Sequence, residues 1–178
     1  LPDMPTRQFM SLPAEYSLRT TKDGIRLFIN PVKEVETLYE NWNRWENITG
    51  EEANEKLRQY NGSQLHVKMR FEVLDYHKFR IRFRGHDIFT YDGSRNLMGP
   101  HDYLYTPNEG VGDMIYDIEL FIDVNMMEAF IDDGALYICD YLKEPRTKAP
   151  LNFDLWDDYY NIKFHYLEIN EMKSIWKN

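Results

Sequence analysis

The stretch QLHVKMRFEVL, residues 64–74, alternates apolar and polar side chains and so limits the folds open to this chain. A period of two places successive side chains on opposite faces of a β-strand. The strand therefore has one apolar face for a core and one polar face. The apolar positions are Leu65, Val67, Met69, Phe71 and Val73, and the polar ones are His66, Lys68, Arg70 and Glu72.

Other short runs share this strand-like character and are separated by turn signals. Lys22-Asp23-Gly24 joins two of them as a hairpin, and Pro31 ends the second. Aromatic residues, which favour strands, make up 15% of the chain. We predict an all-β, two-sheet antiparallel β-sandwich of the jelly-roll, concanavalin-like type. Its further strands are expected at 15–21, 24–30, 78–85 and 86–93, from 114 onward, and at 159–169 and 171–176. The strands at 78–85 and 86–93 are expected to continue the sheet of 64–74.

Residues 32–62 depart from the strand pattern and predict a short helical excursion. VKEVETLYENW, residues 32–42, has apolar side chains at helical spacing. GEEANEKLRQYNG, residues 50–62, has acidic residues early and basic residues late, as a helix dipole favours. Residues 94–112 are rich in glycine and proline and are expected to form a long loop.

The apolar positions around residue 124 change parity. They are even before it, at Ile118, Leu120 and Ile122, and odd after it, at Met127, Ala129 and Ile131. A two-residue turn at 124–125 places all six on one face, with 122 opposite 127 and 121 opposite 128. A second turn at 133–134 pairs 131 with 136 and 128 with 139. The sequence therefore predicts a three-stranded meander over residues 116–141.

This register makes Asp123 and Glu128 diagonal neighbours on the other face, roughly 7–8 Å apart. Two carboxylates in such an arrangement are able to converge on one small ligand. The alternative is that this face is only partly packed and its acidic side chains are solvated. The sequence leaves both open.

The composition excludes several classes of function. A formal net charge of −9 disfavours a nucleic-acid partner. One cysteine excludes an internal disulfide, and five scattered histidines give no metal-binding pattern or expected cofactor. No apolar run is long enough to span a membrane, and no signal peptide is visible. A chain that starts at Leu1-Pro2 is expected to be a piece of a longer protein.

Three segments resemble the C-terminal β-sandwich of glycoside hydrolase family 32, which includes levanases, inulinases and invertases. The first, residues 10–38, is similar to the family pattern M-S-L-P-R-E, G-x-R-L and P-V-K-E. The second, residues 120–134, resembles I-F-V-D-R-S-S-V-E-V-F-V-N-D-G, although Val124 and Asn125 replace the Arg and Ser after the aspartate. The ending MKSIW also matches. The resemblance implies that residues 1–178 are one β-sandwich domain behind an N-terminal five-bladed propeller.

The same resemblance locates catalysis outside this chain. The family's nucleophile, stabiliser and acid/base lie in the motifs N-D-P-N-G, R-D-P and E-C, none of which occurs here. We therefore expect no catalytic residues in this chain. The parent enzyme that the resemblance implies is secreted, periplasmic or at the cell surface, and cuts levan, inulin or sucrose. The sequence does not decide among these substrates, or between endo and exo action.

Three functions remain. The first is a non-catalytic module that stabilises the propeller of the same polypeptide and shapes its substrate cleft; it predicts an apolar patch left open without the propeller. The second is a fructose- or fructan-binding module similar to carbohydrate-binding family 66. The third is an independent glycosidase or lyase. For the second function the expected sugar-binding residues are Asp123, Glu128, Glu15, Arg26, Arg82 and Tyr137.

Other conspicuous residues have simpler explanations. Trp42 and Trp45 are expected to pack from a helix onto the core, and Trp156 to lie on a loop. The arginines at 80, 82 and 84 alternate with apolar residues, so we expect them to pair with acidic residues such as Glu72 across the sheet.

Overall fold

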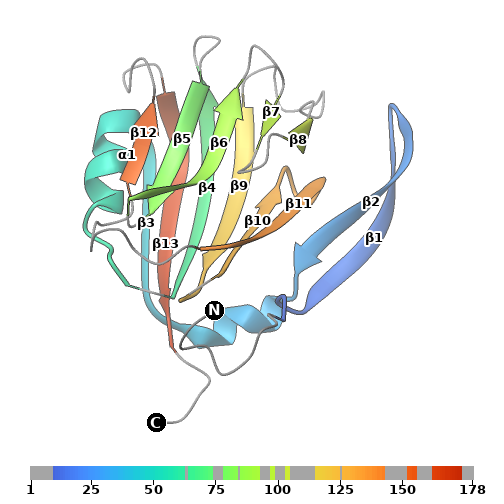
Figure 1. The fold of residues 1–178 in the computed structure, drawn as a ribbon, viewed down its shortest axis with the longest axis horizontal. Helices are drawn as coiled ribbons and strands as arrows, with labels where there is room; N and C mark the ends of the chain where they lie inside the picture. The colour runs from blue at the N-terminus through green and yellow to red at the C-terminus, as the bar shows by residue number, and fades with distance from the viewer. Residues whose placement is uncertain are drawn as a thin grey trace.

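Two antiparallel sheets, packed face to face, form the centre of the molecule (Figure 1). This arrangement confirms the predicted β-sandwich. The computed structural model describes residues 10–62, 64–73, 78–83, 85–92, 97–98, 103–104, 115–124, 126–142, 152–155 and 162–173.

The larger sheet has six strands in the order β11-β10-β9-β4-β13-β3. Their bounds are β3 (Tyr39–Thr49), β4 (Leu65–Val73), β9 (Ile115–Ile122), β10 (Met126–Ile131), β11 (Leu136–Tyr141) and β13 (Ile162–Met172). The smaller sheet has the order β12-β5-β6-β7-β8. Its strands are β5 (Lys78–Phe83), β6 (His86–Asp92), β7 (Leu97–Met98), β8 (Tyr103–Leu104) and β12 (Asn152–Leu155).

The core lies between the two sheets. All five apolar side chains of the alternating stretch in β4 are buried in it, as the period of two predicted. They meet side chains of the smaller sheet, such as Ile81 and Phe89. The hydroxyl groups of Tyr116 and Tyr91 are 2.6 Å apart and join the sheets by a buried hydrogen bond. Burial of this apolar surface is the main force holding the sandwich together.

One helix closes an end of the core. Neither helix of the described chain is long and apolar enough to span a membrane. Helix α1 (Gly50–Leu57) buries Ala53 and Leu57. Its first turn is fixed by a capping box in which Thr49 and Glu52 each bind the other's backbone N–H. The helical reading of 50–62 is thereby confirmed for residues 50–57.

The helix predicted over residues 32–42 is only partly correct. A 3₁₀ helix, η1 (Lys33–Leu38), is present, but β3 begins directly after it at Tyr39. β3 pairs along its length with β13, and Trp45 and Ile48 pack against the core. These non-local contacts outweigh the local helical spacing.

Two strand predictions also need correction. Strands β5 and β6 do not continue the sheet of β4, because they form the opposite layer of the sandwich. Of the two closing strands expected at 159–169 and 171–176, residues 162–172 form one continuous strand, β13, in the interior of the larger sheet. Residues 159–161 and 174–176 lie outside the described part. Within the predicted loop 94–112, residues 97–98 and 103–104 pair as short strands, and the remaining residues lie outside the described part.

A third, two-stranded sheet stands beside the sandwich (Figure 1). It is the predicted hairpin, formed by β1 (Ala14–Thr21) and β2 (Gly24–Pro31). Gly24 adopts a φ of 104°, which a glycine in the predicted turn accepts without strain. We refer to residues 10–38, which comprise this hairpin and η1, as the N-terminal arm.

Candidate functional site

The meander has the predicted register. Ile122 pairs with Met127, and Glu128 pairs with Phe121 on one side and Cys139 on the other. The N–H of Asp123 donates to the carbonyl of Met126 at 2.9 Å and closes the first turn. All six apolar residues used in the parity argument are buried in the main core. The opposite side of the sheet is therefore the face that carries Asp117, Glu119, Phe121, Glu128 and Phe130.

This outer face of the six-stranded sheet, turned away from the five-stranded sheet, is organised in rows that cross the strands. Each row follows from the pairing of neighbouring strands. The first row is Trp42, Asn170, His66, Phe121, Glu128 and Cys139; the second is Arg44, Glu168, Lys68, Glu119, Phe130 and Tyr137; the third is Glu46, Tyr166, Arg70 and Asp117.

The N-terminal arm covers the β10–β11 end of this face. Val35 of η1 joins Phe121 and Phe130 in a second, smaller apolar cluster. Leu12, Ile29 and further partly buried side chains pack against it. The arm thus covers sheet residues that would otherwise be exposed. The rest of this face stays polar.

Glu128 is the polar anchor of the arm. Its side chain is 2% exposed, and its Oε1 accepts a hydrogen bond from the N–H of Leu12 at 2.8 Å. Its Oε2 accepts one from the hydroxyl of Tyr137 at 2.5 Å. Burial, with the adjoining Glu128 carboxylate, raises the pKa of Tyr137 above its ordinary value, so this hydroxyl remains a donor. The alternative of a solvated acid does not hold for Glu128, because the arm covers it.

Asp123 is exposed, and its Oδ1 accepts a hydrogen bond from the N–H of Val124 at 2.7 Å. This local bond fixes the first turn of the meander. Asp123 and Glu128 therefore differ sharply in environment, although they are diagonal neighbours as predicted.

The hairpin is fastened to the turn between β10 and β11. The N–H of Ile29 donates to the carbonyl of Gly134 at 3.0 Å, and the side-chain amide of Asn30 donates to the carbonyl of Asp133 at 3.1 Å. Arg19 forms an ion pair with the Asp133 carboxylate. The two segments that carried the family resemblance, 10–38 and 120–134, thus bind one another.

The other sugar-binding candidates lie apart from this anchor. Glu15 is exposed on β1, and Arg26 forms an ion pair with Asp23 at 3.1 Å near the hairpin tip. Arg82 lies on the opposite sheet, where it contacts Asp87 at 2.7 Å. The structure brings Glu128 and Tyr137 into contact but does not gather the six residues around one site. Sugar binding by that set stays a prediction.

The remaining expectations have mixed outcomes. Arg80 and Arg82 do not pair with Glu72, which lies on the other sheet; both contact Asp87 of the neighbouring strand. Trp45 packs on the core as expected, but from a strand, whereas Trp42 is 61% exposed. Arg84 and Trp156 lie outside the described residues.

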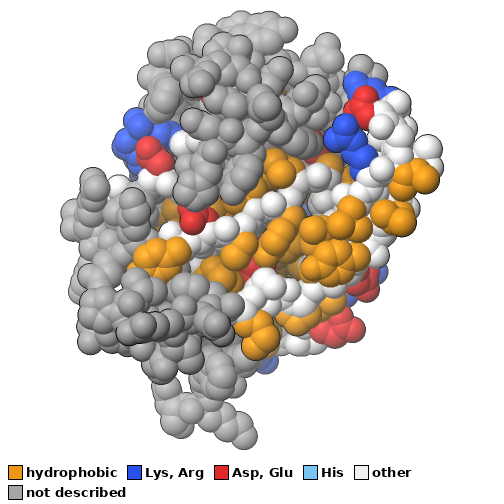
Figure 2. All heavy atoms as spheres, turned by 45° about the vertical axis from the view of Figure 1, so that its right-hand side comes forward, with side chains coloured by type: hydrophobic (Ala, Val, Ile, Leu, Met, Phe, Trp, Pro, Cys, Tyr) orange, Lys and Arg blue, Asp and Glu red, His pale blue; other side chains and the backbone are white. Residues whose placement is uncertain are grey.

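One face of the hairpin is apolar and open to solvent. Tyr16, Leu18, Ile25 and Leu27 are 68%, 73%, 72% and 49% exposed, and cross-strand pairing places them on the same side. Figure 2, which brings the hairpin side of the molecule forward, shows hydrophobic side chains gathered there. A cluster of exposed apolar side chains often marks a surface that contacts another protein or domain.

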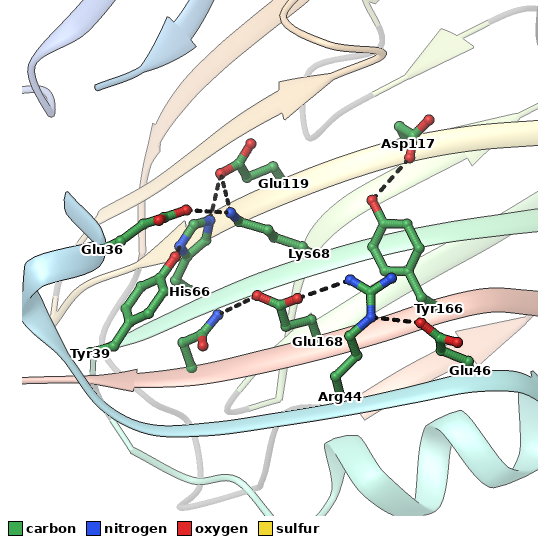
Figure 3. A network of polar contacts seen from close by, with 11 residues as sticks. Glu36, Tyr39, Arg44, Glu46, His66, Lys68, Asp117, Glu119, Tyr166 and Glu168 are labelled. Carbon is green, nitrogen blue, oxygen red and sulfur yellow. Dashed lines mark hydrogen bonds and ion pairs between the residues drawn. The ribbon is translucent and has the colours of Figure 1, made fainter. Parts of the chain in front are cut away.

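The middle of the outer face carries a network of polar side chains centred on His66 (Figure 3). The His66 ring is buried and stacks on Phe121 with centroids 3.7 Å apart. Its Nδ1 lies 2.6 Å from the Tyr39 hydroxyl, and its Nε2 lies 2.7 Å from Glu119 Oε1. Because a carboxylate only accepts, Nε2 carries the proton and Nδ1 accepts from Tyr39.

The network makes stability depend on pH in a defined direction. Burial lowers the pKa of His66 below its ordinary value of 6.5, partly offset by Glu119. The unfolded chain then binds a proton more readily than the folded one, so stability is full above pH 6.5 and falls as the pH drops toward the folded pKa. We expect a slope of at most about 1.4 kcal/mol per pH unit, measured by urea unfolding between pH 7.5 and 5.

The variant His66→Gln provides the comparison, since an amide can still donate to Glu119 and accept from Tyr39 without titrating. Its stability is expected to change less with pH across this window. Parallel curves for the two proteins would contradict the assignment.

A second part of the network surrounds Asp117 in the third row. Its carboxylate accepts a hydrogen bond from the Tyr166 hydroxyl at 3.2 Å and forms an ion pair with Arg70 at 3.1 Å. Burial raises the pKa of Asp117, partly offset by Arg70, and burial beside Asp117 raises the pKa of Tyr166 to about 12. Nearby, Lys68 lies 3.3 Å from Glu36 and 3.8 Å from Glu119. Sequence reasoning identified this polar face by its alternation but did not predict the network, which joins four strands and the arm.

Comparison with known proteins gives one relative in sequence. The chain is 25% identical to a levanase of Bacillus subtilis in an alignment that covers 99% of this chain but 29% of the levanase. No family model matches the chain. The chain thus spans less than a third of the relative's length.

Solved structures of related fold are also longer proteins. A β-fructofuranosidase from Schwanniomyces occidentalis matches 92% of this chain over 40% of its own, with a TM-score of 0.66 and 16% identity. An exo-inulinase from Aspergillus awamori matches 98% of this chain over 38% of its own, with a TM-score of 0.67 and 12% identity. A sucrose-6-phosphate hydrolase from Lactobacillus gasseri has a TM-score of 0.60.

These likenesses establish the fold, and the levanase adds a likeness in sequence along almost the entire chain. Each of these similar proteins extends well beyond the part that this chain matches. The recognition drawn from the motifs is confirmed: this chain resembles the C-terminal β-sandwich of the family 32 glycoside hydrolases.

Proposed function

We propose that this chain is the non-catalytic C-terminal β-sandwich module of a fructan- or sucrose-hydrolysing glycosidase. In this proposal it docks on a catalytic propeller of the same polypeptide, stabilises it and shapes its substrate cleft. The lengths of the relatives support this reading, because each is a glycoside hydrolase of which the chain matches a fraction. The absence of the three family catalytic motifs from the sequence agrees with it.

The observation that carries the proposal is the open apolar face of the hairpin. Leu18 and Leu27 form a cross-strand pair at its centre and are 73% and 49% exposed. The arm that bears them is anchored to the sheet by Glu128 and Gly134. Exposed apolar side chains on an anchored support are suited to burial against a second domain of the same chain.

The proposal predicts a loss of stability that appears only in the longer polypeptide. The double variant Leu18→Lys with Leu27→Lys removes two apolar contacts from the interface and places two charges there. Full burial of each leucine is worth about 1.5–3 kcal/mol. We expect the thermal half-life of fructan-hydrolysing activity in the full polypeptide to fall at least roughly tenfold, which corresponds to about 1.4 kcal/mol.

A matched control carries Gln59→Lys and Asn61→Lys, two exposed positions after α1 on the described chain. It adds the same charge and is expected to leave the half-life unchanged. The isolated sandwich with lysines at 18 and 27 should unfold at the same urea concentration as the unmodified sandwich, since both leucines are exposed there. Equal losses in the isolated sandwich and the full polypeptide would show that the hairpin face does not dock.

A fructose-binding function is the second candidate. One feature favours it: a cavity on the outer face, lined by carboxylates, a lysine and a tyrosine. A sugar at that position would not depend on the set of six residues predicted from the sequence.

A further inference from the structure

A cavity of about 270 Å³ lies on the outer face beside the turn between β10 and β11. Lys68, Asp117, Glu119 and Tyr166 contribute polar side chains to its lining. Phe130 gives it an apolar side, and Asp133 with Gly134 forms the wall toward the turn. A space of this size holds a single small ring and approaches the lower limit of known ligand pockets, roughly 300 Å³.

The polar groups of the cavity retain capacity for hydrogen bonds. Glu119 uses Oε1 toward His66 and Lys68, while its Oε2 has no hydrogen-bond or ion-pair partner among the described residues. The Lys68 ammonium has carboxylate neighbours at 3.3 and 3.8 Å. Both distances exceed the roughly 2.7–2.9 Å of a strong charge-assisted bond, so its N–H groups can still serve a ligand.

The charge of the lining selects against ions. Three carboxylates, from Asp117, Glu119 and Asp133, line the cavity with one ammonium, and two of them are already paired with Arg70 and Arg19. The lining therefore offers no net positive charge to hold an anion such as phosphate. A metal ion has no suitable cage, because no three His, Cys, Asp or Glu side chains of the described chain are grouped to hold one. A cationic ligand would meet Lys68. A neutral ligand with several hydroxyl groups fits the mixture of acceptors and donors.

We infer that this cavity binds a neutral, hydroxyl-rich ring, with a fructosyl unit as the ligand expected if the proposed function holds. Glu119 Oε2 accepts hydrogen bonds from sugar hydroxyls, and Lys68 and Tyr166 bind the sugar oxygens. The apolar side formed by Phe130 contacts the C–H groups of the ring. The site is distinct from the anchor at Glu128, whose two oxygens are already used by the arm.

Titration calorimetry with fructose on the chain itself tests the site. We expect saturable binding with a Kd on the order of 1 mM, as suits a small ligand held by a few hydrogen bonds. Glu119→Gln replaces the free acceptor oxygen with a donor and should weaken binding at least roughly tenfold. Fructose 6-phosphate should bind no more tightly than fructose, because the lining offers no net positive charge to the phosphate group.

The matched control is Glu46→Gln, which removes a carboxylate from the same sheet face outside the cavity. It should leave the Kd within about twofold of the original value. If Glu119→Gln unfolds the chain, Tyr166→Phe replaces it, since that change removes one hydroxyl from the cavity. Circular dichroism establishes the folded state of each variant before titration.

Three outcomes would overturn the site. They are no heat of binding at tens of millimolar fructose, an affinity that neither Glu119→Gln nor Tyr166→Phe lowers, and an affinity lost in Asp123→Ala while both cavity variants retain it. The last outcome would return the sugar to the residues predicted from the sequence. None of these results bears on docking, because the hairpin test measures the stability of the longer polypeptide.

Discussion

Replacing Gly134 with alanine is expected to lower the free energy of unfolding by about 3 kcal/mol or more. A Cβ at this position would lie 2.2 Å from the carbonyl oxygen of Ile29 and 2.7 Å from its carbonyl carbon. Both atoms belong to the hairpin backbone, so the contact cannot be relieved by rotating a side chain. Gly134 also has a φ of 82°, where an alanine is strained. The arm must therefore move away from the turn.

Urea unfolding measures the loss, and hydrogen exchange at the Ile29 amide reports whether the hairpin has separated from the turn. The matched control is Gly24→Ala at the hairpin tip. Gly24 has a φ of 104°, but a Cβ there would meet nothing within 4 Å. It should cost only the backbone strain, about 1–2 kcal/mol. If the two alanine variants were equally stable, close approach of the arm to Gly134 would not be the cause.

The second large effect is expected from Glu128→Ala. The substitution leaves the N–H of Leu12 and the hydroxyl of Tyr137 without their acceptor in a covered position. Each unsatisfied buried group costs about 1–3 kcal/mol, so for the two groups we expect a loss of roughly 2–6 kcal/mol. Limited proteolysis should then cut the chain near Leu12 sooner, because the bond that holds the start of the arm is gone.

Two variants separate the anchor from a general effect of charge. Glu128→Gln keeps one acceptor oxygen, and the Tyr137 hydroxyl can turn to accept from the new amide, so its loss should be near 1 kcal/mol. Asp123→Ala removes a carboxylate from an exposed turn and should change stability by less than about 0.5 kcal/mol. The anchor would be refuted by Glu128→Ala being no less stable than Asp123→Ala.

The meander could be predicted from sequence because its register follows from one local rule. Side chains alternate along a strand, so the parity change between Ile122 and Met127 required a turn of even length between them. The pairing of Glu128 with Phe121 and Cys139 followed directly. The hairpin could be predicted equally well, since Gly24 marks its turn and Pro31 marks its end.

What sequence reasoning missed depends on contacts between distant segments. The burial of Glu128 follows from the path of Leu12, 116 positions earlier, which no periodicity reveals. The start of β3 was predicted as helix because apolar residues in 32–42 have helical spacing, yet its conformation is decided by pairing with β13. The cavity beside Glu119 is likewise formed by strands that meet only in the folded sheet.

The position of β13 has a consequence for how the molecule is made. This strand is the last described element of the chain, and it lies between β3 and β4 in the six-stranded sheet (Figure 1). While the chain is still emerging from the ribosome, β3 lacks the strand with which it pairs, and one edge of β4 stays open. The meander can pair with β4 early, but the sheet closes only after residue 172 has left the exit tunnel. A nascent chain stalled before Ile162 would therefore expose two sheet edges to whatever chaperone attends it.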